Sequence, residues 1–230
     1  MDLLLLLIAA LASGSLTFGA VLGLVWIPPQ QLLATILAFA SGAFITALAT
    51  DLFVESVETA GIVLPGASLL AGAIVYVVAI LFVERIGRGS DGMSLFLGSL
   101  FDGIPESVVL GITFIGGTET LPLFVAIVVN NVPEGIGGAS EMQSAGSSRS
   151  SILVLWTATG VVLFVSVVAG NVFLQGVSSV TLAVVRSFAG GAILATLADA
   201  TMPDAFEEGG PAVAVATAVG FLMTFALTVI

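Results

Sequence analysis

Residues 152–172 read ILVLWTATGVVLFVSVVAGNV, and this stretch contains no charged side chain. The uncharged run continues to Val185, and Arg186 is the first charge that follows it. A helix of about 20 mostly apolar residues is long enough to cross the hydrocarbon core of a bilayer. A water-soluble core needs no uncharged run of this length. The stretch therefore predicts a membrane-spanning helix.

The rest of the chain has the same character. Of its 230 residues, 58% are hydrophobic and 8% are charged, whereas roughly a quarter of a soluble protein is charged. We expect an all-α polytopic membrane protein with one transmembrane domain over residues 1–230, because no connection is long enough for a soluble domain. Eight spans are predicted, near residues 2–25, 31–54, 64–84, 92–115, 121–143, 151–172, 180–202 and 211–230.

The few charges near the span ends predict the orientation. The first segment has Asp2 in place of a basic start, so we expect a retained helix and not a signal peptide. With eight spans, Arg85 and Arg88 share one side of the membrane with Arg149. The positive-inside rule makes that side cytoplasmic. We expect a protein of the cell (inner) membrane with both termini outside, and with Arg186 snorkelling to the outer interface.

One internal repeat is visible. The segment Ala40–Thr50, ASGAFITALAT, aligns with Ala189–Asp199, AGGAILATLAD, and the same register sets Glu55 opposite Asp204. In the predicted topology the two spans run in opposite directions, as in transporters built from inverted repeats. The alternative is chance similarity, because Gly and Ala are common wherever membrane helices touch.

Acidic residues inside two spans point to function. Asp102 and Glu106 lie in the fourth span and Glu134 lies in the fifth, with no Arg or Lys in the same spans. A charge at the bilayer centre is costly unless it is paired, hydrated or bound to an ion. Asp102 and Glu106 are four residues apart, as are Asn130 and Glu134, so each pair shares a helix face. If the two spans are antiparallel neighbours, four oxygen-bearing side chains converge on one point.

A proline precedes each glutamate. Pro105 and Pro133 cannot donate the usual helical hydrogen bond, which frees the carbonyl groups of Phe101 and Val129. Such breaks are tolerated in a membrane helix where it is buried in protein or lines a water-filled cavity. A single proline would indicate an ordinary kink, but two at equivalent places beside glutamates favour a site.

The ligand chemistry is restricted to oxygen. The chain has no Cys and no His, which removes thiolate and imidazole ligands. Carboxylate and amide oxygens suit hard and borderline divalent cations. A second set of acids lies nearer the span ends, where they are either solvated or ligands along an access path: Asp51, Glu55, Glu141, Asp199 and Asp204.

These motifs resemble the ZIP family of divalent metal transporters. That family has a His-Asn-x-Pro-Glu/Asp-Gly type motif in its fourth helix, which Asp102-Gly-Ile-Pro-Glu-Ser107 matches. Its fifth helix carries a similar motif, which Asn130-Asn-Val-Pro-Glu-Gly135 matches and which is the most specific part. Asp51-Leu-Phe-Val-Glu55 and Met202-Pro-Asp-Ala-Phe-Glu207 are similar to the family's second and seventh helices.

The resemblance implies eight helices in a 3+2+3 arrangement, elevator-like alternating access and import toward the cytoplasm. It also implies a two-metal centre between helices four and five. By position, the main site would be Asp102, Glu106, Asn130 and Glu134. Gly103 and Asn131 would fall at a second site, with the two glutamates bridging.

Departures from the family pattern change the expected ion. Asp102 and Asn130 stand where the family usually has His or Gln, and Gly103 has no side chain to offer. The sixth span has no acid to complete a second site. We therefore expect one good site for Zn²⁺, Mn²⁺ or Fe²⁺, with Mg²⁺, Ca²⁺ and Cd²⁺ as further candidates, and a weaker preference for zinc than imidazole would give.

Three functions compete at this stage. A divalent-cation transporter is the leading hypothesis, with the bilayer and the metal ion as partners, no nucleic acid, no enzymatic activity and a homodimer left open. A receptor-like paralogue that binds metal without transporting it is the first alternative. An intramembrane carboxylate protease is the second, although the Gly-x-Gly-Asp context of such enzymes is missing.

Overall fold

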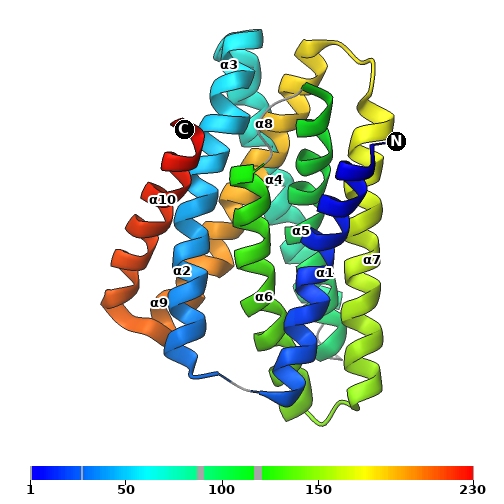
Figure 1. Ribbon diagram of the computed structural model, residues 1–230, viewed down its shortest axis with the longest axis vertical. Helices are drawn as coiled ribbons and strands as arrows, with labels where there is room; N and C mark the ends of the chain where they lie inside the picture. Colours follow the sequence, from blue (N-terminus) through cyan, green and yellow to red (C-terminus); the bar gives the residue numbers. More distant parts are fainter. Residues whose placement is uncertain (1, 27, 87–90, 117–120, 230) are drawn as a thin grey trace.

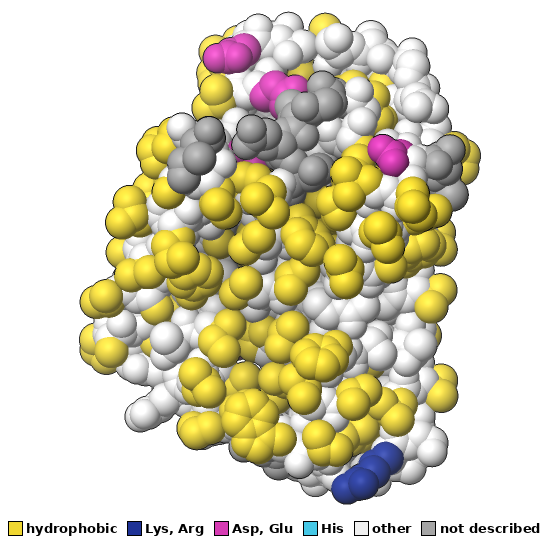
Figure 2. Space-filling view, in the orientation of Figure 1, with side chains coloured by type: hydrophobic (Ala, Val, Ile, Leu, Met, Phe, Trp, Pro, Cys, Tyr) yellow, Lys and Arg dark blue, Asp and Glu magenta, His cyan; other side chains and the backbone are white. Residues whose placement is uncertain are grey.

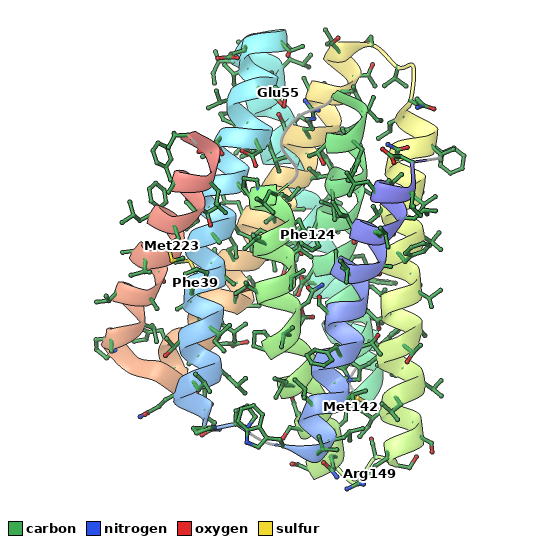
Figure 3. All side chains as sticks on the ribbon, in the orientation of Figure 1. Phe39, Glu55, Phe124, Met142, Arg149 and Met223 are labelled. Carbon is green, nitrogen blue, oxygen red and sulfur yellow. The ribbon has the colours of Figure 1, made fainter. Side chains whose placement is uncertain are left out.

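The computed structural model describes residues 2–26, 28–86, 91–116 and 121–229, and all regular structure within them is helical. The helices lie roughly along the long axis of one bundle (Figure 1). We call the end that carries the N-terminus the upper end, and the end that carries Arg149, labelled in Figure 3, the lower end. Arg88, used above to predict the orientation, lies outside the described residues.

The elements follow one another with short connections. In chain order they are α1 (Leu3–Val25), α2 (Gln30–Ala47), the π-helix η1 (Leu48–Val54), α3 (Glu55–Ala60), α4 (Val63–Ile86), α5 (Asp91–Gly116), α6 (Leu121–Ser144), α7 (Arg149–Leu174), α8 (Ser179–Thr196), the π-helix η2 (Leu197–Thr201), α9 (Met202–Gly209), the 3-10 turn η3 (Gly210–Ala212) and α10 (Val213–Val229).

By length and composition, seven helical segments among the described residues are able to cross a membrane. The last of them, Ser179–Val229, changes direction at Gly210, whose φ of 65° ends α9, and α10 then packs against α2. Hydrophobic side chains cover the middle of the visible face in Figure 2, with acids toward the upper end and arginine at the lower end. The prediction of an all-helical, multi-pass membrane protein is confirmed at this coarse level.

Two helices run further than the sequence predicted. The second span was expected to end near residue 54, but η1 and α3 continue it to Ala60, where Gly61 has a φ of 71°. The seventh was expected to end near residue 202, but α9 continues it to Gly209. Pro203 does not stop this helix, because it directly follows the π-helix η2, where the regular pattern of backbone hydrogen bonds is already altered.

Glycines set the closest helix contacts. At each such glycine an added Cβ would overlap a backbone carbonyl of the facing helix, so the two backbones approach one another directly. The pairs are α1 with α6 (Gly19, Gly135), α5 with α7 (Gly111, Gly170), α2 with α10 (Gly42, Gly220) and α4 with α8 (Gly72, Gly191).

Two large apolar clusters fill the described part of the bundle between these pairs, and a smaller third one packs α2 against α9 and α10. The upper cluster gathers buried side chains from α1, α2, η1, α5, α6, α7, α8 and η2, among them Phe44, Leu110 and Leu123. The lower cluster packs Leu16, Met142 and Trp156 together with neighbours from α1, α6 and α7. The candidate site lies on α5 and α6, whose central residues run between the two clusters.

Candidate metal centre

The two proline-containing motifs come together inside the bundle. Glu106 on α5 is 3% exposed and lies within electrostatic range of both Glu134 on α6 and Asp102. Glu134 is likewise within range of Asp102. The structure therefore places three carboxylates in one region, and the buried Asn130 lines the same cavity as Asp102 and Glu134. Among the described residues, however, no three Asp or Glu side chains converge closely enough to enclose an ion in this conformation.

Among the described residues, hydroxyl groups contact two of the three carboxylates, Asp102 and Glu134. Thr196 on α8 donates a hydrogen bond to Asp102 Oδ1 at 3.2 Å, and the hydroxyl of Tyr76 on α4 also contacts this carboxylate. Ser99 on α5 lies beside Glu134, and both line the same cavity. The salt bridge recorded between described residues joins Arg186 to Glu55 and involves none of these three acids.

Asn130 carries an unsatisfied group. Its side chain is 7% exposed, and its Oδ1 atom is buried without a hydrogen-bond partner. Leaving a buried amide oxygen unpaired costs free energy, because the group has lost its bonds to water and gained nothing in return. A cation beside the neighbouring carboxylates would satisfy this oxygen.

The prolines lie inside continuous helices, as the sequence predicted. Pro105 is within α5 and Pro133 is within α6. Each removes a backbone donor from its helix, so a carbonyl one turn earlier has no helical partner. Pro133 also lines the cavity described next, which is the setting in which a broken membrane helix is tolerated.

A cavity of about 410 Å³ reaches the site, and its lining includes Asp102, Asn130 and Glu134. A second cavity of about 400 Å³ lies against it and is lined toward the lower end by Ser144 and Glu208. The two share Leu37, Pro133, Gly137, Glu141 and Asp204. Together they form a path, which we call the lower cavity, from the lower end of the bundle to the carboxylates.

The opposite side of the site is filled. The upper cluster of apolar side chains packs there, and Glu55 of α3 and Arg186 of α8 form an ion pair beyond it. Arg186 is 4% exposed. The prediction that it snorkels to the outer interface is wrong, because its guanidinium finds a carboxylate inside the protein.

The expected access residues divide between the two ends. Glu141 and Asp204 line the lower cavity, and Asp199 accepts a hydrogen bond from Tyr76 at 3.4 Å near the site. Asp51 lies in η1, where it accepts a hydrogen bond from Thr50 at 2.6 Å. Glu55 follows it in α3 and belongs to the ion pair with Arg186.

The two positions that the family resemblance assigned to a second metal are occupied by other contacts. Asn131 is buried, and its Nδ2 donates a hydrogen bond to the carbonyl of Ala12 on α1 at 3.0 Å. An added Cβ at Gly103 would meet the side chain of Leu163 on α7. Asn131 thus joins α6 to α1, and Gly103 faces an apolar neighbour.

Sequence reasoning missed the hydroxyl partners Tyr76, Thr196 and Ser99. Serine and threonine in membrane helices commonly bond to their own backbone, so their presence in a span predicts nothing about a site. Tyr76 offered one signal, because it is the only tyrosine in the chain and lies in the middle of an apolar span.

Neither a scan against protein-family models nor a search among curated proteins finds a match to this chain. The residues and their geometry therefore carry the functional proposal.

Proposed function

We propose that this protein carries a divalent metal cation across the membrane, and that Asp102, Glu106, Asn130 and Glu134 bind the ion on its way. The observation that carries the proposal is the buried Oδ1 of Asn130, which has no hydrogen-bond partner and lines the same cavity as Asp102 and Glu134. No ion pair between described residues involves these carboxylates. A divalent cation would satisfy both the amide oxygen and the excess negative charge.

The donor set favours ions that accept oxygen ligands. Carboxylate and carbonyl oxygens suit Mn²⁺, Mg²⁺ and Ca²⁺, whereas imidazole and thiolate would favour later transition metals and zinc. We propose Mn²⁺, Fe²⁺ or Zn²⁺ as the transported ion, with Mg²⁺, Ca²⁺ and Cd²⁺ as further candidates and with zinc bound less selectively than it would be by histidine. Water in the lower cavity would complete the coordination shell of the ion.

The cavity supports passage of an ion in preference to permanent storage. It gives the carboxylates an open route to the lower end, with Glu141 and Asp204 along the way. The upper cluster blocks the other side. This is one of the two states that alternating access requires, with the site open to one side only.

The helix pairs support eight crossings built as an inverted repeat. If α1, α2 and α4 correspond to α7, α8 and α10, then the contact of α1 with α6 mirrors that of α7 with α5. The contact of α2 with α10 likewise mirrors that of α8 with α4. In each proposed repeat the second helix, α2 or α8, continues into a π-helix that contains an aspartate. This pattern supports a 3+2+3 arrangement with α5 and α6 at its centre.

The orientation follows from the arginines. Arg149 begins α7 at the lower end, and the positive-inside rule makes that end cytoplasmic. The lower cavity would then open to the cytoplasm, with both termini on the outer face. Movement of the ion toward the cytoplasm rests on the resemblance to the ZIP family.

We expect the proposed site to bind one metal ion. Asn131 is committed to α1 and Gly103 faces Leu163, so the second position of a two-metal centre lacks its ligands. Glu106 and Glu134 would then serve one ion and would not bridge two.

Uptake into liposomes tests the proposal. The purified protein is reconstituted around a dye that Mn²⁺ quenches, and uptake is compared among the wild type, Glu106→Ala and Glu134→Ala. Because each glutamate supplies charge to the site, we expect either substitution to reduce uptake to the level of empty liposomes. Glu58→Ala, on the exposed face of α3, is the matched control and is expected to transport normally.

The same experiment separates the alternatives. Full uptake by a folded Glu106→Ala or Glu134→Ala variant would overturn the assignment. If the wild type binds Mn²⁺ but carries none, the receptor-like reading is favoured.

A further inference from the structure

The Glu55–Arg186 ion pair is the one salt bridge recorded between described residues, and it joins α3 to α8. The side chain of Arg186 is 5% exposed and that of Glu55 is 32% exposed. Glu55 lies near the upper end of the bundle (Figure 3). The pair therefore fastens two helices together at the end opposite the lower cavity.

Helix α8 contributes both to the ion pair, through Arg186, and to the proposed metal site, through Thr196. Thr196, which contacts Asp102, is ten residues after Arg186 on α8. At a rise of 1.5 Å per residue this separates them by about 15 Å along the helix. Two members of the upper cluster mark this interval. Ile193 lies between Arg186 and Thr196 on α8, and Leu52 lies on η1, which packs against α8. An upward exit between these helices requires α3 and η1 to move away from α8.

The repeat assigns a counterpart to each member of the ion pair. The register that aligns Ala40–Thr50 with Ala189–Asp199 sets Glu55 opposite Asp204 and Arg186 opposite Leu37. Leu37 and Asp204 both line the lower cavity. Each copy has an acid, Glu55 or Asp204, but leucine stands where the other copy has arginine. The lower end therefore has no ion pair equivalent to the one that joins α3 and α8 at the upper end.

We propose that the Glu55–Arg186 ion pair is the upper gate of the transporter, and that its missing counterpart at Leu37 leaves the lower end open at rest. This inference rests on the proposed function and on the inverted repeat that supports it. Separating the two side chains would leave the buried guanidinium of Arg186 without its counter-charge, so opening the upper end is unfavourable while both residues are present. The pair thus biases the equilibrium between the two states toward the one that opens downward.

Two single-cysteine reporters follow the two ends, because the natural chain contains no cysteine. Ala47→Cys places a thiol in the upper cluster, where Ala47 is fully buried. Gly137→Cys places one in the lower cavity, where an added Cβ meets no atom within 4 Å. The rate of reaction with N-ethylmaleimide is measured for each reporter in purified protein without metal.

The first gate variant is Arg186→Met, which keeps the bulk of the side chain and removes its charge. We expect the labelling rate of the Ala47→Cys reporter to rise about tenfold, because the upper end opens more often, and that of the Gly137→Cys reporter to fall. Glu58→Gln removes another α3 carboxylate, one that is exposed, and is the matched control with no expected effect. Unchanged labelling at both reporters in folded Arg186→Met protein would overturn the gate.

The second variant installs the missing counterpart. Leu37→Arg puts a guanidinium opposite Asp204 in the lower cavity, where there is room for it. We expect it to fasten the lower end, so that labelling of the Gly137→Cys reporter falls and labelling of the Ala47→Cys reporter rises. Adding Asp204→Asn should cancel the change. If Arg186→Met fails to fold, an unchanged labelling pattern in Leu37→Arg would by itself overturn the proposal.

These outcomes are distinct from those of the uptake experiment. Labelling requires neither metal nor flux, so a chain that fails to transport can still have its upper end held by the ion pair. A transporter with normal uptake and unaltered labelling would keep its proposed function and lose the gate.

Discussion

Asn130 is the residue on which the proposed metal site depends most directly. Its amide oxygen is buried without a partner, while its neighbour Asn131 donates to the backbone of α1. The sequence predicted that both asparagines would be ligands by motif position. The structure separates them, because adjacent helical residues point about 100° apart and only one of the two can face the cavity.

The identity of residue 130 should influence which metal is preferred. We expect Asn130→His to raise the ratio of Zn²⁺ to Mn²⁺ affinity about tenfold, because an imidazole ligand favours zinc over manganese. Affinities are measured by calorimetry on the purified protein. The matched control is Asn171→His, at an asparagine on α7 whose amide donates to Gly111, where no change in the ratio is expected. An unchanged ratio in Asn130→His would place residue 130 outside the coordination shell.

At the scale of the element, glycines and prolines have different tasks in α6. Gly135 brings the helix against α1, and Pro133 lines the cavity on another face. The sequence predicted the proline break and its place beside Glu134. It could not predict which glycines face a neighbouring backbone, because this depends on the helix rotation that packing selects.

Two glycines of α6 make that distinction measurable. An added Cβ at Gly135 would overlap the backbone carbonyl of Leu16, whereas one at Gly137 meets nothing within 4 Å. We expect Gly135→Ala to lower the free energy of unfolding by about 1–3 kcal/mol through overpacking. Gly137→Ala is expected to be neutral or stabilising by up to about 1 kcal/mol, because alanine favours the helix. Thermal unfolding in detergent compares them, and equal midpoints would contradict the close contact of α1 with α6.

At the scale of the whole molecule, the sequence predicted an all-helical, multi-pass membrane protein, and it predicted that the two proline-containing motifs lie within membrane-spanning helices. It did so because long uncharged runs and paired intramembrane acids are local features of the chain. It did not predict the hydroxyl groups of Tyr76 and Thr196 beside Asp102, nor the burial of Arg186 against Glu55. These contacts join residues 94 and 131 positions apart, as for Thr196 with Asp102 and Arg186 with Glu55, and they depend on tertiary packing.

The asymmetry between the two ends is also a property of the whole molecule. Similar sequences occupy both halves of the proposed repeat, yet a cavity opens at the lower end and an apolar cluster with an ion pair fills the upper end. In the sequence, this asymmetry corresponds to leucine at position 37 where the aligned position of the other copy has Arg186. The difference can be interpreted only when the structure places these two residues toward opposite ends of the bundle.

Anomalous diffraction from crystals soaked in Mn²⁺ tests the central claim most directly. We expect one peak at the end of the lower cavity, between α5 and α6, with oxygen atoms of Asp102, Glu106, Asn130 and Glu134 around it. In crystals of the Glu134→Ala variant the peak should disappear. No peak at this place in the wild-type protein, or two fully ligated ions there, would contradict the account.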